Sequence, residues 1–194
     1  MVYRYVTEYM KHGLTREMVE KALRRLGDLA AADEIQLEIA LYGGTAMMLA
    51  YDRRVITRDV DAVVIPSDVA VRYIRQVAQE LSLHEKWLND DVRVYLGARG
   101  QTRPLQQFSD HPGLRIQVAT AGYLLAMKAL ACRDALPGYE GDLGDLEWLI
   151  RKMNIQSVEE IQEHIDKYYD DDPVALDKVK ILQQIIAKVH QGEK

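Results

Sequence analysis

Two short stretches decide the fold of this chain: LYGGTAMMLA at residues 41–50 and RDVD at residues 58–61. Apolar side chains recur at every second position from residue 35 to residue 41, which is the spacing of a β-strand. The Gly43-Gly44 pair ends this strand. The run over residues 45–50 predicts a helix that begins directly after the glycines.

A glycine turn between a strand and a helix leaves the backbone amides at the start of the helix bare. Gly43 and Gly44 allow the sharp turn, and Thr45 then stands in the first turn of the helix. Bare amides at a helix N-terminus form an anion site that suits a triphosphate.

The second stretch lies on a predicted strand over residues 58–65 and carries two acids, Asp59 and Asp61. Residues two apart on a strand point to the same face, so we expect these carboxylates to lie side by side. Their mutual repulsion favours a bound cation, and Mg²⁺ prefers oxygen ligands and shares them with phosphates. An anion cradle facing two carboxylates is typical of metal-assisted phosphoryl or nucleotidyl transfer. Taken alone, the glycine pair can be an ordinary turn, and the two aspartates can be a solvated strand end.

Working outward, the periodicity predicts a mixed α/β core near residues 35–120. We expect N-caps at Thr15 and Ser67, further strands over residues 92–97 and 114–119, and a loop over residues 98–113. Helices are expected over residues 2–12, 16–32, 68–81, 123–134, 142–153, 157–169 and 173–190. The fold class is therefore α/β (α+β), a mixed sheet flanked by helices with helical N- and C-terminal extensions. We expect residues 1–134 to form the core with its leading helices, and residues 135–194 to form a helical region packed on it.

The composition excludes several classes of protein. The chain has 194 residues, 48% of them hydrophobic and 28% charged, which is ordinary for a globular domain and unlike a disordered one. The net charge of −5 gives no overall attraction to nucleic acid. The single cysteine, Cys132, excludes an intramolecular disulfide and a cysteine-based zinc cluster, and we expect it to be buried. Without a signal-peptide pattern or a membrane-spanning run, we expect a cytoplasmic protein with no membrane partner.

The pattern Gly43-Gly44 followed by Arg58-Asp59-Val60-Asp61 resembles the core signature of the DNA-polymerase-β-like nucleotidyltransferase superfamily. Within it, the chain is similar to uncharacterised bacterial proteins grouped near the AbiEii/AbiGii toxin family. The likeness extends over residues 38–170 and includes WLND at 87–90, GLRIQVA at 113–119, YLLAMK at 123–128 and DLGDL at 142–146.

The resemblance implies a nucleotidyltransferase fold and a set of site residues. It implies phosphate contacts from Gly43, Gly44 and Thr45, and Mg²⁺ ligands in Asp59 and Asp61. It also implies a nucleotide contact from Lys128, and Arg58, beside the acid pair, is a further candidate for nucleotide binding. The implied reaction moves a nucleoside monophosphate from a nucleoside triphosphate to a hydroxyl of RNA, protein or a small molecule and releases pyrophosphate. The family also implies a toxin–antitoxin or phage-defence setting with a cognate toxin or antitoxin.

Four of the charged residues also have structural interpretations. Arg58 is placed to neutralise phosphate or to pair with Asp59. Lys128 either faces the nucleotide or extends its stem along an apolar helix toward solvent. Asp142 and Asp145 share a helix face, from which they either reach the site or only cap and solvate their helix.

One departure from the family pattern concerns a third carboxylate, which in many active members lies on a later core strand. On the predicted strand over residues 114–119, the nearest residue to that place is Gln117, which cannot act as a base or as an anionic ligand. Asp90, Asp91 and Asp110 are candidates to replace it. The alternative function is a catalytically inactive module that binds nucleotide or a protein partner, and a second alternative is a helical scaffold without nucleotide affinity. Among the histidines, only His111 is singled out for a test.

Overall fold

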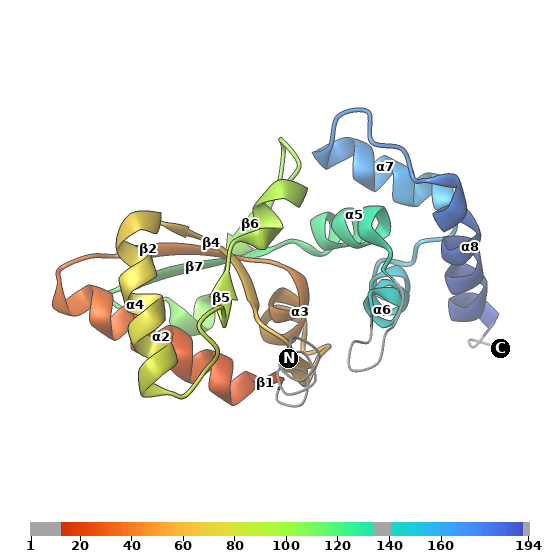
Figure 1. The fold of residues 1–194 in the computed structure, drawn as a ribbon. Coiled ribbons are helices and arrows are strands. Elements are labelled where there is room, and N and C mark those ends of the chain that lie inside the picture. Colours follow the sequence, from red (N-terminus) through yellow and green to blue (C-terminus); the bar gives the residue numbers. More distant parts are fainter. Residues whose placement is uncertain (1–12, 134–140, 192–194) are drawn as a thin grey trace, which may run out of the picture. The chain divides into compact units, whose positions relative to one another are not determined.

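The computed structural model describes residues 13–133 and 141–191, and these form two compact units (Figure 1). The N-terminal unit contains residues 13–94 and 102–119, and the C-terminal unit contains residues 95–101 and the described residues from 120 onward. The division therefore falls earlier than the expected boundary after residue 134, and one short internal segment is grouped with the C-terminal helices. The helix expected over residues 2–12 lies outside the described part of the chain.

The N-terminal unit is built on a five-stranded sheet with the order β5-β4-β2-β7-β6. Central strand β2 runs parallel to β7 and antiparallel to β4, which confirms the mixed α/β class. The strands are β2 (Leu37–Leu41), β4 (Val60–Ile65), β5 (Leu88–Asn89), β6 (Thr102–Pro104) and β7 (Leu114–Ala119).

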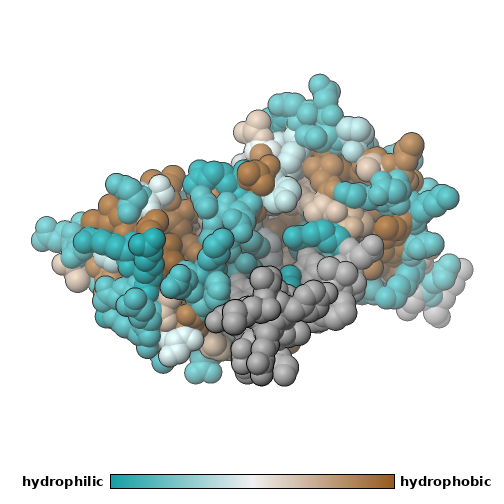
Figure 2. Space-filling model, viewed as in Figure 1, coloured by the Kyte–Doolittle hydropathy of each residue, from teal (hydrophilic) through white to brown (hydrophobic). Residues whose placement is uncertain are grey.

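Helices α2 (Arg16–Ala32) and α4 (Ser67–Glu80) lie side by side on one face of this sheet (Figure 1). The strand residues of the buried face alternate with more exposed ones: Val60, Ala62 and Val64 are buried, whereas Asp61 and Val63 between them are half-buried. Hydrophilic residues cover much of the visible outer surface of the two helices (Figure 2). The apolar stripe of each helix thus meets the apolar rows of the strands, as amphipathic elements require.

The N-terminal unit also contains a second, two-stranded sheet. Strands β1 (Leu14–Thr15) and β3 (Ile56–Thr57) pair antiparallel, and neither was predicted from the sequence. Helix α3 (Gly43–Tyr51) begins at the glycine pair itself, two residues earlier than expected. It contacts β3, β4 and β7, so the turn after β2 is held against the strand that carries Asp61.

Other local predictions are confirmed or wrong for identifiable reasons. The hydroxyl of Thr15 caps α2, as expected, by accepting the Met18 N–H at 3.3 Å. Ser67 is not an N-cap, because α4 begins at Ser67 and its N-cap position is Pro66. The strand expected over residues 92–97 is wrong: Asp91–Tyr95 form a 3₁₀ helix, η1. The expected loop over residues 98–113 contains strand β6 and a second 3₁₀ helix, η2 (Gln106–Phe108).

The C-terminal unit is helical in its described part. It contains α5 (Ala121–Ala131), α6 (Leu143–Met153), α7 (Val158–Tyr168) and α8 (Leu176–Gln191). Helix α5 packs against α6 and α7, and α8 packs against α6. The guanidinium of Arg99 donates to the carbonyls of Asp166, Lys167 and Tyr169, so segment 95–101 caps the C-terminal end of α7.

Cys132 is buried, as predicted, and follows the last turn of α5. No helix in the described ranges combines the length and the apolar character that crossing a membrane would demand.

Candidate functional site

The predicted site residues of the N-terminal unit meet where β2 ends and α3 begins. Gly43 is the first residue of α3 and has φ +54°, in the left-handed region that favours glycine. A Cβ atom built on Gly43 would lie 2.2 Å from Oδ2 of Asp61. The Asp61 carboxylate therefore lies directly against the start of the helix, where only a glycine leaves room for it.

The backbone of Asp59 is fixed by two hydroxyl groups. Thr45 and Thr57 both donate to its carbonyl oxygen, at 3.0 and 3.1 Å. Both threonines are buried, so these bonds are shielded from competing water. Thr45 was predicted to bind phosphate through the helix start; in the structure its hydroxyl holds the bend that presents Asp59. Thr57 was not predicted, although it stands two residues before Asp59 in the sequence.

The carboxylate of Asp59 is held from the other side by Asn89. The Asn89 side-chain amide donates from Nδ2 to Oδ2 of Asp59 at 2.9 Å. In the parallel pairing of β4 with β5, the register partner of Asn89 is Asp61. Asn89 therefore lies beside both acids, and it is the second site residue that sequence reasoning missed. The sequence signal was its place in the WLND run at residues 87–90, which had been noted only as part of the resemblance.

The geometric argument that predicted the acid pair needs a correction. Strand β4 begins at Val60, so Asp59 lies in the bend before the strand and the rule of alternating strand faces does not apply to it. The threonine hydroxyls hold the Asp59 backbone, and Asn89, the register partner of Asp61, holds the Asp59 carboxylate. Both remain half-buried, and Arg58 beside them is exposed.

Gln117 lies on the same sheet face as Asp61 but not next to it. Its register partner is Ala40 on β2, and Ala40 in turn pairs with Val63 on β4, so one strand separates Gln117 from the strand of Asp61. The Gln117 side-chain oxygen accepts the hydroxyl proton of Thr102 at 2.6 Å. Strand β7 (Leu114–Ala119, sequence LRIQVA) carries no carboxylate.

The candidate replacement acids differ in position. Asp110 and His111 precede the N-terminal end of β7, whereas Asp61 is near the C-terminal end of the parallel strand β2, so they lie at the opposite end of the sheet. His111 instead contacts Asp28, with 3.2 Å between Nε2 and Oδ1. Asp90 and Asp91 directly follow Asn89 and are exposed, and Asp90 pairs with Arg93 at 3.1 Å. Only these two of the candidates lie near the site.

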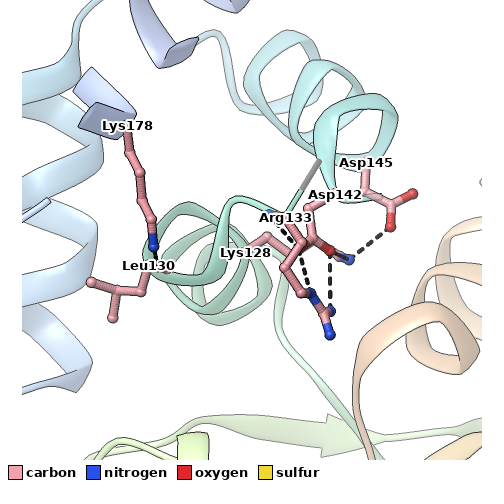
Figure 3. A network of polar contacts seen from close by, with 6 residues as sticks. All are labelled: Lys128, Leu130, Arg133, Asp142, Asp145 and Lys178. Atoms are coloured by element: carbon pink, nitrogen blue, oxygen red, sulfur yellow. Dashed lines mark hydrogen bonds and ion pairs between the residues drawn. The ribbon is translucent and has the colours of Figure 1, made fainter. Parts of the chain in front are cut away.

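Lys128 belongs to the C-terminal unit, where it forms a buried ionic cluster (Figure 3). Its ammonium lies 2.9 Å from Asp142 and 2.8 Å from Asp145, and only 5% of the residue is exposed. Arg133 adds a second cation, with its Nε 2.8 Å from Asp142. The lysine does not extend to solvent, and the two acids do not merely solvate their helix. They join the end of α5 to the start of α6.

The cations of the cluster stabilise the ionised form of Asp142. Burial by itself would raise the pKa of Asp142, but the Lys128 ammonium and the hydrogen bonds from Arg133 and Lys128 lower it to about 2. Asp142 is therefore ionised at neutral pH, and the removal of a cation that pairs with such a buried carboxylate is expected to destabilise the fold.

The described surface of the N-terminal unit includes two hollows of different volume. The larger, about 480 Å³, is lined by residues around Arg16 and Arg54 and includes none of the predicted site residues. The smaller, about 220 Å³, is lined by residues of β4, α4 and the segment after α4, among them Asn89 and Asp90. Asp59 and Asp61 line neither of these two hollows.

The donor atoms of the site fit a hard cation. Asp59 and Asp61 offer carboxylate oxygens, and Mg²⁺ is commonly bound by one or two carboxylates together with substrate phosphates and water. Across residues 13–133 and 141–191, no group of three or more histidine, cysteine or acidic side chains forms a metal cluster.

Comparisons with protein-family models, with curated proteins and with solved structures give no match to this chain.

Proposed function

We propose that this protein is a Mg²⁺-dependent nucleotidyltransferase that moves a nucleoside monophosphate from a nucleoside triphosphate to an acceptor hydroxyl. The observation that carries the proposal is the contact between Gly43 at the start of α3 and the carboxylate of Asp61, with Asp59 held beside them. An anion-binding helix start and two carboxylates within one small site suit a metal–triphosphate complex better than either component alone.

In the proposed reaction, the amides of Gly43, Gly44 and Thr45 bind phosphate oxygens, and Asp59 and Asp61 hold Mg²⁺. Mg²⁺ held by these two carboxylates would supply positive charge that balances the triphosphate and the departing pyrophosphate. The bond that breaks joins the α- and β-phosphates, and the bond that forms joins the α-phosphate to the acceptor oxygen. Thr45 and Thr57 keep Asp59 in place throughout through their bonds to its carbonyl.

The two cationic residues of the proposal have different surroundings. Arg58 is exposed and adjacent to Asp59 in the chain, which suits a contact with the triphosphate. A phosphate role for Lys128 requires its ammonium to keep, or to share, its two ion pairs with Asp142 and Asp145. We retain that role as the resemblance implies it.

The acceptor proton needs a base, and we assign this role to Asp90 or Asp91, which directly follow Asn89 at the end of β5. The acceptor class, whether RNA, protein or a small molecule, and the partnership with a cognate toxin or antitoxin follow from the resemblance alone.

One observation favours a second candidate function, a catalytically inactive module that binds nucleotide or a protein partner. The residue nearest the expected third acid, Gln117, is neutral and is bonded to Thr102. A site without a base can keep its affinity for a metal–nucleotide complex and lose turnover.

Nucleotide binding is tested by thermal unfolding with Mg²⁺ and each nucleoside triphosphate in turn. A ligand present at 100 times its Kd stabilises the folded state by about 2.7 kcal/mol and raises the Tm by several degrees. The Asp59→Ala/Asp61→Ala variant should lose the shift, and Asp110→Ala, at the far end of the sheet, should keep it. If no triphosphate raises the Tm of the wild type, both proposed functions that involve nucleotide are wrong.

A further inference from the structure

We propose that Asn89 is a positioning residue of the site, which from β5 fixes the Asp59 carboxylate for cation binding. This inference rests on the proposed function, because it assigns a cation to the acid pair. It differs from the family expectation, which looks for a third carboxylate on the strand of Gln117.

Both ends of the Asn89 amide have a defined partner. Its Oδ1 accepts the backbone N–H of Asp91 at 3.0 Å, and its Nδ2 donates to Asp59 at 2.9 Å. An N–H group needs an acceptor, so the bond from Asp91 determines which end of the amide is oxygen. The NH₂ group is therefore directed at the carboxylate of Asp59.

The backbone that carries Asn89 is firmly anchored. Trp87 and Leu88, the two preceding residues, are both buried, and the indole N–H of Trp87 donates to the carbonyl of Ile74 at 3.1 Å. The backbone N–H of Val60 in turn donates to the Trp87 carbonyl at 2.7 Å. The amide thus extends from a fixed support, as a group that orients another side chain must.

A hydrogen bond from a neutral amide to one carboxylate oxygen fixes the orientation of the whole carboxylate group. Such a bond to an ionised acceptor is stronger than one between neutral groups, and it adds no charge that would compete with the metal. Partners that orient metal ligands in this way typically change metal affinity by about 10–100-fold when they are removed. Gln117 cannot play this part, because strand β2 separates it from β4.

The test measures the binding of Mn²⁺ alone to the full chain by electron paramagnetic resonance, with no nucleotide present. Asn89→Ala removes the amide, and Asn89→Leu removes it while keeping the same branching at Cγ. The matched control is Gln36→Ala, which deletes an exposed amide bonded only to the Pro112 carbonyl at 3.2 Å. Gln117→Ala tests the competing strand.

We expect both Asn89 variants to bind Mn²⁺ about 10–100-fold more weakly than the wild type, with Gln36→Ala and Gln117→Ala unchanged. In an Asp59→Ala background, which removes the acceptor of the Asn89 bond, Asn89→Ala should cause no further loss, because the two residues act through that one bond. A merely structural role would weaken binding equally in both backgrounds.

Wild-type affinity in both Asn89 variants overturns the inference, as does a wild type that binds no Mn²⁺. A loss in Gln117→Ala rather than in the Asn89 variants overturns it too. Failure of the proposed function gives a different result: Mn²⁺ binding that depends on Asn89, together with no transfer of nucleotide to any acceptor.

Discussion

The Oδ2 atom of Asp61 lies 2.2 Å from the point where a Cβ atom on Gly43 would stand. The Asp61 carboxylate therefore packs directly against the start of α3, in the space that a side chain at position 43 would need. This contact joins the two sequence stretches that suggested the fold. It also makes Gly43 the residue of the turn whose replacement has the clearest consequence.

Gly43→Ala should destabilise the fold and disable the site together. The positive φ of Gly43 is costly for alanine, and the added methyl group displaces Asp61, so we expect a loss of about 1–3 kcal/mol in the free energy of unfolding. Urea denaturation measures this loss. In an Asp61→Ala background, the part of this loss that comes from the clash with the carboxylate should disappear, and only the part that comes from backbone strain should remain. An equal loss in both backgrounds would contradict the contact.

Lys128→Met should be the most destabilising change in the C-terminal unit. It leaves Asp142 and Asp145 buried beside each other without the ammonium that contacts both, and breaking a buried ion pair typically costs about 3–5 kcal/mol. The matched control is Arg133→Met, which removes a mostly exposed cation from the same carboxylate and should cost less. Chemical denaturation gives both values, and similar losses in the two variants would argue against the buried cluster.

Acid should weaken the same cluster in a defined window. The folded-state pKa of Asp142 is about 2, below its ordinary value of 3.8. The stabilisation is therefore fully present above about pH 4 and is lost as the pH falls toward 2. The loss amounts to about 2 kcal/mol.

The free energy of unfolding, measured from pH 5 to pH 2, checks this loss, and Asp142→Asn should flatten that part of the curve. Glu80, whose pKa is lowered to about 2 by hydrogen bonds from Arg25 and Gln76, contributes in the same window. The Glu80→Gln variant therefore serves as the control, because it removes this separate contribution of Glu80 from the same part of the curve. If Asp142→Asn and the wild type lose stability in parallel, the carboxylate is not held by its cations as described.

The sequence was sufficient for the parts of the fold that depend on periodicity. Helix α2 has the predicted bounds and the predicted Thr15 cap, and β2, β4 and β7 were found because their buried residues alternate. The glycine pair and Asp61 meet as expected, because a strand–turn–helix unit brings the helix start next to the neighbouring strand.

What could not be predicted depends on pairing between distant segments. Strand β6 is three residues long and contains Pro104, which an edge strand tolerates, so its only clear determinant is its partner β7. The role of Asn89 likewise needs β5 to pair with β4, and the role of Thr57 needs the bend before β4. The burial of Asp142 and Asp145 follows from the packing of α6 on α5, which helix periodicity alone does not specify.

The most direct test of the central claim is incubation of the pure protein with Mg²⁺ and each α-labelled nucleoside triphosphate, with total RNA and cell protein as acceptors. The account predicts label transferred by the wild type and none by the Asp59→Ala/Asp61→Ala variant, with the labelled fraction identifying the acceptor class. Transfer that persists in the variant, or no transfer by a wild type that binds the nucleotide, would contradict it.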